Sequence, residues 1–367
     1  MTSPLDIYDL KLKVFGAPSR YVQGRGILNR TASFARQVGK SAVLVADIQI
    51  LPLIEDTLRK SFQAAEIPLL ILPFEGHLGL NTATQLVSSL KTYVPEIVIA
   101  AGGGRAIDAG KALADTCNLR LITVPTVASN DAPTSKNYVL YDENEVLVEV
   151  RHLARNPDFV IVDTQLLASA PKAMFAAGLG DALSKKAEAL ACAAGRGGTM
   201  FRARPTNLAV SIASLCYDTL LCHGQAAFDA AGSGQPTEAF ENAVEAMILM
   251  AGLGFESGGL SVPHALTRGL SKVPGVARRP HGYQVAYGLV VHHKLIGIEF
   301  PEPLRELYRH TGLPTNLRLL AQAPVEPAYF AAIAEATIGV PHMLNFPRPI
   351  SVEDLVTAMR AVEDDEA

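Results

Sequence analysis

The chain has 367 residues, of which 49% are hydrophobic and 19% charged, and its formal net charge is −4. This composition is typical of a folded globular protein and excludes an intrinsically disordered chain. The sequence has no basic run or tail, no secretory leader and no apolar stretch of about 18 residues, so we expect no nucleic-acid partner, no membrane span and a cytoplasmic location.

The first 165 residues alternate short apolar runs with helical patterns such as those over 50–65 and 81–94. The apolar runs are SAVLVAD (41–47), PLLILPF (68–74), PEIVIAAGGG (95–104), LRLITVPT (119–126) and PDFVIVD (157–163). This alternation predicts a mostly parallel, Rossmann-like α/β domain over residues 1–165 that binds NAD. The segment 138–150 instead predicts a hairpin with a polar turn at 142–144.

From Ala168 onward, Ala- and Leu-rich segments with helical periodicity replace the β-branched runs. They predict an all-helical domain over residues 166–367. The Gly- and Pro-rich segment 230–240 is interpreted as a loop between two of its helices.

A glycine run follows the strand predicted at 95–104. Gly102, Gly103 and Gly104 precede a helical pattern, and this arrangement lets a pyrophosphate approach the backbone and the helix N-terminus. A tight strand-to-helix turn would also need glycine. Asp47 ends the strand 41–47 and is the candidate that binds the adenine ribose, which would favour NAD over NADP.

Four further positions each have two interpretations. Asp131 lies in the polar loop after the strand 119–126, where it either contacts a ligand or forms an Asx-turn. Asp181, in GLGDAL, is either a functional carboxylate or a helix N-cap. His264 and His281 are either structural residues or metal ligands.

Five motifs in order resemble the glycerol dehydrogenase family, the NAD- and zinc-dependent branch of the iron-containing alcohol dehydrogenase superfamily. They are AGGGRAIDAGKA, PTVASNDAPTS, GLGDAL, GLGFESGG and HGYQVAYG, and the resemblance covers nearly the whole chain. It implies metal ligands at Asp181, His264 and His281. Two imidazoles and one carboxylate leave an open coordination position, as catalytic Zn²⁺ requires, and the same set also suits Fe²⁺.

The resemblance also implies NAD as cofactor, a small alcohol or hydroxy acid as substrate, and a homo-oligomer. It places Asp131 against the substrate. The positions that it assigns to the cofactor, besides the three glycines and Asp47, are Asp108, Thr126, Ser129, Ser135 and Tyr141.

Two cations depart from the family's pattern. Arg268, in HALTRGL, stands where the family often carries a histidine, and Lys185 stands where it often carries a neutral residue. Each follows a predicted ligand by four residues, so we expect both beside the metal, in contact with the substrate. Alternatively, Lys185 pairs with Glu188 and Arg268 points to solvent.

The sequence therefore predicts NAD- and metal-dependent oxidation of a small polyol or vicinal diol to the ketone. One alternative is the same chemistry on an anionic hydroxycarboxylate or a phosphorylated polyol, which the two cations would suit. Another is a dehydroquinate synthase-like lyase, which shares the fold, NAD and a metal.

Overall fold

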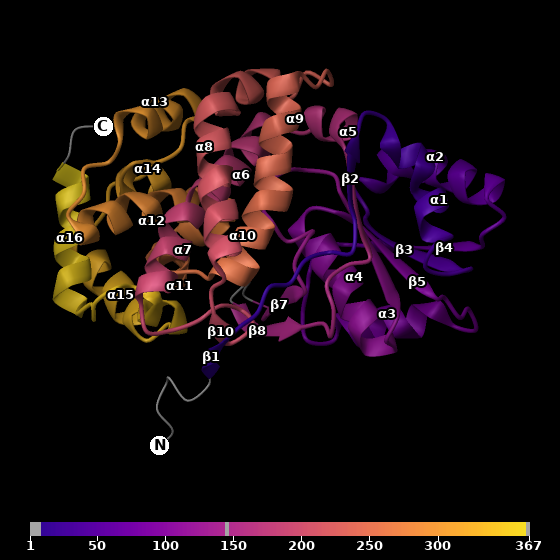
Figure 1. Ribbon diagram of the computed structural model, residues 1–367, viewed down its shortest axis with the longest axis horizontal. Helices are drawn as coiled ribbons and strands as arrows, with labels where there is room; N and C mark the ends of the chain where they lie inside the picture. The colour runs from indigo at the N-terminus through magenta and orange to yellow at the C-terminus, as the bar shows by residue number, and fades with distance from the viewer. Residues whose placement is uncertain (1–8, 144–146, 365–367) are drawn as a thin grey trace. The chain divides into compact units, whose positions relative to one another are not determined.

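The computed structural model describes residues 9–143 and 147–364 (Figure 1). The chain forms two compact units. The helical unit comprises Met1–Gly16, Lys172–Asp229 and Glu245–Ala367, and the sheet unit comprises Ala17–Pro171 and Ala230–Val244.

Within the described residues, six strands form the parallel sheet of the sheet unit. Their order across the sheet is β2 (Tyr21–Gly24), β9 (Phe159–Asp163), β6 (Arg120–Pro125), β5 (Ile97–Gly102), β3 (Ala42–Asp47) and β4 (Leu69–Phe74). All five predicted strands are present, which confirms the Rossmann-like prediction. The edge strand β2 was missed because its four half-buried residues are too few to give a pattern.

Helices cover both faces of this sheet. Leu44 and Ile99 pack on the face covered by α1 (Thr31–Ala35) and α2 (Leu51–Ala64), which follow the 3₁₀ turn Ile27–Arg30. Val43 and Val98 pack on the other face, against α3 (Thr82–Leu90) and α4 (Gly104–Cys117). Because both faces are buried, the strands read as continuous apolar runs.

The predicted hairpin is also present in the sheet unit. Strands β7 (Asn137–Tyr141) and β8 (Leu147–His152) pair antiparallel. Residues 144–146, which include one end of the predicted turn, lie outside the described residues.

Segments of the two units alternate along the chain, whereas the sequence predicts a single domain boundary after residue 165. Strand β1 (Asp9–Lys13) pairs with β10 (Ala203–Arg204) in the helical unit. Helix α9 (Glu238–Glu245) is bound to the sheet unit through Glu241, whose carboxylate lies 2.7 Å from Arg25 Nε and whose backbone oxygen accepts a bond from Gln23 Nε2 at 2.9 Å. The loop predicted at 230–240 is present at 231–237, between α8 (Asn207–Ala230) and α9, because residues 238–240 already belong to α9, and it lies in the sheet unit.

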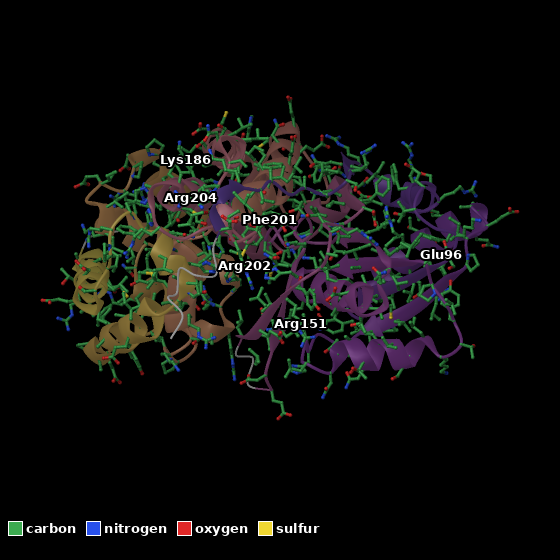
Figure 2. The ribbon with its side chains drawn as sticks, turned by 60° about the horizontal axis from the view of Figure 1, so that its bottom comes forward. Glu96, Arg151, Lys186, Phe201, Arg202 and Arg204 are labelled. Carbon is green, nitrogen blue, oxygen red and sulfur yellow. The ribbon has the colours of Figure 1, made fainter. Side chains whose placement is uncertain are left out.

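The rest of the chain is helical, as predicted. Its elements are α5 (Thr164–Ala168) in the sheet unit, then α6 (Lys172–Leu183), α7 (Lys185–Ala194), α8 (Asn207–Ala230), the π-helical turn Ala246–Met250, α10 (Ala251–Gly258), α11 (Val262–Leu270), the 3₁₀ turn Val276–Arg278, α12 (His281–Ile296), α13 (Glu302–Thr311), α14 (Leu317–Ala321), α15 (Pro327–Ile338), the 3₁₀ turn Pro341–Asn345 and α16 (Val352–Asp364). Arg204, labelled in Figure 2, ties β10 to the end of α7 by donating to the backbone oxygens of Gly195 and Gly197.

Among the described residues, no single helix is long and apolar enough to cross a membrane. Glu238–Gly258 and Val262–Leu270 reach that length and composition only when taken together, and they are bent by 92°.

A buried lysine on α4 fixes the loop that follows β6. Lys111 has no exposed side-chain surface, and its Nζ donates to the backbone oxygens of Ala132 at 2.7 Å and Asn137 at 2.6 Å. Its charge is balanced by Asp108, whose Oδ1 lies 3.3 Å away and whose Oδ2 accepts from the Val139 amide. Sequence reasoning missed Lys111, although its place three residues after Asp108 on one helix face was visible.

We expect Lys111→Met to lower the free energy of unfolding by about 3–5 kcal/mol, because it leaves Asp108 as an uncompensated buried charge. Denaturant unfolding measures the change. Lys60→Met is the control, since its pair with Asp56 is 74% and 78% exposed, and it should cost less than about 1 kcal/mol. Equal effects of the two substitutions would contradict this account of Lys111.

Candidate metal centre and cofactor site

The structure brings the three predicted metal ligands together in the helical unit. Asp181 lies in the last turn of α6, His264 in the first turn of α11, and His281 is the first residue of α12. One ligand atom from each side chain lies within 4.8 Å of the other two, and the imidazole centroids are 5.2 Å apart. Asp181 is buried, His264 is half-buried and His281 is exposed.

Close helix crossings produce this convergence. A Cβ added at Gly282 of α12 would lie 1.7 Å from the Ala177 backbone oxygen of α6. One added at Gly288 would lie 2.7 Å from Pro263 Cα of α11. Glycine at these two positions therefore lets α12 approach both neighbours, so that their ligand-bearing ends meet.

The helix boundaries correct the N-cap interpretation of Asp181. That residue lies in the last turn of α6, which ends at Leu183, rather than at the start of a helix, and α7 starts at Lys185. All residues from Phe175 to Leu183 are buried, so the segment has no exposed polar face that would show where the helix ends. Pro263 lies in the first turn of α11 and starts that helix without kinking it.

Glu188 of α7 orients His264, and sequence reasoning did not assign it this role. Its carboxylate is fully buried and its Oε2 lies 2.7 Å from His264 Nδ1. Oε1 accepts from the backbone N–H groups of Ser261 at 2.8 Å and His264 at 3.2 Å. A carboxylate on the second ring nitrogen is the usual support of a metal-ligating histidine, and here it directs Nε2 toward Asp181. The only signal in the sequence was a glutamate seven residues, two helical turns, after Asp181.

Charge pairing sets the protonation of this cluster. Burial alone would raise the pKa of Asp181, but the Lys185 ammonium and His264 hold it well below its usual range. Burial likewise opposes ionisation of Glu188, yet His264 and Lys185 lower its pKa to about 2. For His264, burial favours the neutral ring, but the charge of Glu188 outweighs it and raises the pKa to about 9. Both carboxylates are therefore ionised at neutral pH.

The donor set fits one divalent transition-metal ion. It offers one carboxylate oxygen and two imidazole nitrogens, and His281 is exposed, so a fourth position remains open to a small ligand.

The two cations that were predicted beside the metal, Lys185 and Arg268, lie in different surroundings. Lys185 Nζ lies 2.6 Å from Asp181 Oδ1, so its closest pairing is with the predicted metal ligand rather than with Glu188. Arg268, one turn after His264 on α11, has an exposed side chain. Lys185 thus lies in the metal centre, as predicted, whereas no described contact joins Arg268 to the three ligands, and its role stays a prediction.

The glycine run of the sheet unit has the geometry expected of a phosphate-binding turn. Gly102 ends β5 with φ 142°, Gly103 precedes α4 in an extended conformation, and Gly104 begins the helix. A Cβ at Gly102 would lie 2.6 Å from Ala106 Cβ and 3.3 Å from Asp47 Cβ. Asp47, half-buried at the end of β3, is therefore adjacent to this turn.

The loop after β6 carries most of the other predicted cofactor residues. The Thr126 amide donates to the Gly102 oxygen at 3.1 Å, and Thr126 Oγ1 is buried without a hydrogen-bond partner among the described residues. That hydroxyl fits a bound polar ligand beside the glycine turn. Asp131 and Ser135 are buried in the same loop, whereas Ser129 is half-buried there.

Two predicted cofactor residues have structural contacts. Asp108 is directed to Lys111 and to the Val139 amide. Tyr141, at the end of β7, donates its amide to the Leu78 oxygen at 2.9 Å, and the Arg105 guanidinium lies 5.4 Å from its ring centroid. Their contacts with a cofactor stay predictions.

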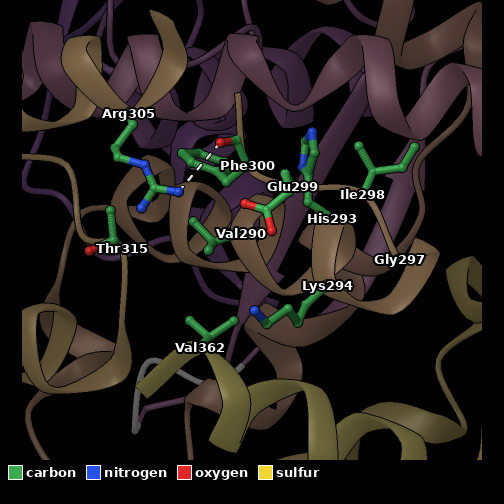
Figure 3. A pocket seen from close by; sticks show the side chains of 10 residues that line it. All are labelled: Val290, His293, Lys294, Gly297, Ile298, Glu299, Phe300, Arg305, Thr315 and Val362. Atoms are coloured by element: carbon green, nitrogen blue, oxygen red, sulfur yellow. Dashed lines mark hydrogen bonds between the residues drawn. The ribbon is translucent and has the colours of Figure 1, made fainter. Parts of the chain in front are cut away.

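A separate pocket of about 240 Å³ lies at the C-terminal end of α12 (Figure 3). Phe300 and Arg305 line it, and Arg305 donates to the Phe300 oxygen at 3.4 Å. Among the described residues that line it, none is a predicted ligand, so this pocket is distinct from the metal centre.

Comparisons with known proteins agree with this fold. Residues 18–164 match the iron-containing alcohol dehydrogenase family model. A glycerol dehydrogenase of Escherichia coli is 35% identical, with 88% of this chain and 89% of that protein aligned. A glycolaldehyde reductase of Halobacterium salinarum is 34% identical, with the same shares aligned. The crystal structure of glycerol dehydrogenase from Schizosaccharomyces pombe superposes with a TM-score of 0.91 at 29% identity, covering 97% of this chain and 91% of that one.

The chain therefore belongs to the iron-containing alcohol dehydrogenase family, in the branch that contains the glycerol dehydrogenases. It is an oxidoreductase that acts on a CH–OH group of a small molecule. Membership of this family implies a nicotinamide cofactor and a metal ion.

We expect His264→Ala and His281→Ala to abolish metal binding and dehydrogenase activity, because each removes one of two nitrogen ligands. Metal analysis of the purified variants and circular dichroism test this expectation. His293→Ala is the control, because within the described residues the hydrogen bond of this α12 side chain is to the backbone oxygen of Leu289, at 2.9 Å, and not to any of the three ligands. Full occupancy and turnover in His281→Ala would show that the ligand assignment is wrong.

We expect Glu188→Gln to lower the pKa of His264 from about 9 in the metal-free protein, because the substitution removes the charge that raises it. A protonated Nε2 cannot bind a metal ion, so the metal affinity of the unsubstituted protein should rise as the pH increases toward 9. The metal affinity of the Glu188→Gln protein should stop rising at a lower pH, because its His264 loses the proton at a lower pH. NMR titration of the His264 ring measures the pKa, with the surface change Glu55→Gln as control. An unchanged pKa in Glu188→Gln would contradict the assignment of Glu188.

Proposed function

We propose that this protein is an NAD- and zinc-dependent dehydrogenase that oxidises glycerol or a related vicinal diol to the hydroxyketone. The observation that carries the proposal is the convergence of Asp181, His264 and His281 in a chain related to glycerol dehydrogenases. Three protein ligands with an open position are a usual arrangement of a catalytic zinc site, and the same donor set also suits Fe²⁺, so the choice of zinc is itself part of the proposal.

The residues of the helical unit would bind and orient the substrate hydroxyl. When bound, the metal ion would supply Lewis-acid chemistry at that hydroxyl, and NAD⁺ would accept the hydride. Glu188 fixes the ring of His264 through its 2.7 Å contact with Nδ1, so the Nε2 lone pair is directed to the centre once its proton has left. Asp181 supplies a carboxylate that is already ionised at neutral pH.

The residues of the sheet unit would bind the cofactor. Gly102, Gly103 and Gly104 leave space for the pyrophosphate at the N-terminus of α4, where backbone N–H groups favour an anion. Asp47 would accept hydrogen bonds from the adenine ribose. We also propose that Thr126, Ser129, Ser135 and Tyr141 line the cofactor and that Asp131 contacts the substrate.

An anionic hydroxycarboxylate or a phosphorylated polyol is the second candidate substrate class. Lys185 supports it, because a buried ammonium within 2.6 Å of Asp181 adds positive charge to the centre. The exposed position of Arg268 does not add to this support. The relatives favour the neutral polyol, and they give no independent support to the lyase alternative.

A substrate screen tests the proposal directly. We expect the zinc-loaded protein to form one NADH per molecule of ketone from glycerol or propane-1,2-diol, with a higher kcat/KM than for lactate or glycerol 3-phosphate. Removal of the metal with a chelator should abolish turnover, and adding zinc back should restore it. Formation of product without net NADH would favour a lyase and would contradict the proposal.

We expect NAD to be preferred over NADP, because the Asp47 carboxylate would repel a 2′-phosphate. Asp47→Gly should narrow the ratio of the two kcat/KM values, whereas Asp56→Asn, an exposed change on α2, should leave it unaltered. Steady-state kinetics with both cofactors measure the ratio. Equal kcat/KM for NAD and NADP in the unsubstituted enzyme would contradict the assignment of Asp47.

A further inference from the structure

Lys185 is in contact with two of the three metal-ligating atoms. Its side chain is 1% exposed, and its Nζ lies 2.6 Å from Asp181 Oδ1 and 3.2 Å from His264 Nε2. Asp181 Oδ1 is itself 3.2 Å from His264 Nε2, so the ammonium and these two atoms form a compact triangle. An ion that binds His264 through Nε2 must use the nitrogen that Lys185 contacts, and it must share the Asp181 carboxylate with the ammonium.

The surroundings of Lys185 explain why a cation is stable there. Asp181 and Glu188 are 2% and 0% exposed, and buried carboxylates are costly unless a positive charge is near. The Phe255 ring centroid lies 5.7 Å from Nζ and adds a cation–π contact. Lys185 of α7 therefore places a positive charge against Asp181 of α6 and beside His264 of α11, and its contacts join these three helices.

The neighbouring lysine shows that this position is specific. Lys186, labelled in Figure 2, pairs with Asp218 at 3.0 Å, and its side chain is 33% exposed. Its Nζ lies 4.5 Å from the Tyr217 ring centroid and has no described contact with the three ligands. Lys186 therefore carries the same charge on the same helix outside the metal centre and is a matched control.

We propose that Lys185 is a resident cation of the metal centre, which holds the ligands together in the metal-free protein and competes with the metal ion for Asp181 and His264. Metal binding then requires the ammonium to give up its contacts with both residues. The protein consequently binds its metal more weakly, and loses less stability without it, than it would with a neutral side chain at position 185. This inference rests on the three-ligand metal site of the proposed function but not on the substrate.

The test compares the full-length protein with Lys185→Met and Lys186→Met. Zinc affinity is measured by competition with a chromogenic chelator at one fixed pH, and the Tm of the metal-free and zinc-loaded forms is measured by calorimetry. We expect Lys185→Met to bind zinc about ten- to a hundredfold more tightly, the range spanned by charge-assisted hydrogen bonds. Its metal-free form should melt at a lower temperature, whereas Lys186→Met should match the unsubstituted protein in both measurements.

Equal zinc affinity and equal metal-free Tm in Lys185→Met and the unsubstituted protein would overturn the inference while leaving the metal site intact. Weaker zinc binding by Lys185→Met would also overturn it, because Lys185 would then support the metal. Absence of zinc binding in all three proteins would overturn the proposed function as well. If Lys185→Met does not fold without metal, Lys185→Thr provides the same affinity comparison with the smaller neutral residue.

Discussion

Two buried carboxylates of the helical unit, Asp181 and Glu188, need positive partners, and the rest of the metal centre depends on this requirement. A buried charge is tolerated only when it is paired and hydrogen-bonded. Glu188 meets the condition through His264 and two backbone N–H groups, and Asp181 meets it through Lys185. Because these contacts link α6, α7 and α11, the charges also determine where the ligand-bearing ends of the helices lie.

The sheet unit also contains a buried carboxylate that is paired with a buried lysine. Lys111 is fully buried, pairs with Asp108 and donates to two backbone oxygens of the segment that follows β6. That segment carries Thr126 and Asp131. The buried ammonium of Lys111 on α4 therefore holds in place the residues proposed to bind the cofactor and the substrate. Each unit therefore contains a buried lysine, and the contacts of that lysine within the protein hold in place residues that are proposed to bind ligands.

Local features were predictable from the sequence, whereas long-range contacts were not. The runs at β3 and β5 and the turn at Gly102 follow from apolar patterning and glycine chemistry, which act over a few residues. The candidate metal ligands were identified from the sequence only because their motifs resemble those of a known family. The role of Glu188 and the attachment of α9 to the sheet unit depend on contacts between distant segments, and no local pattern records them. The position of Asp181 in the last turn of α6 could not be predicted, because every residue from Phe175 to Leu183 is buried and the sequence there shows no exposed face.

The central claim is that Asp181, His264 and His281 bind the catalytic metal ion together. X-ray diffraction from crystals of the zinc-loaded enzyme, recorded on both sides of the zinc absorption edge, tests this claim most directly. The account predicts an anomalous peak within bonding distance of one oxygen of Asp181 and one nitrogen of each histidine, with Lys185 no longer in contact with Asp181. A peak elsewhere in the chain would contradict it, whereas a Lys185–Asp181 contact retained beside fully occupied zinc would contradict only the proposed competition by Lys185.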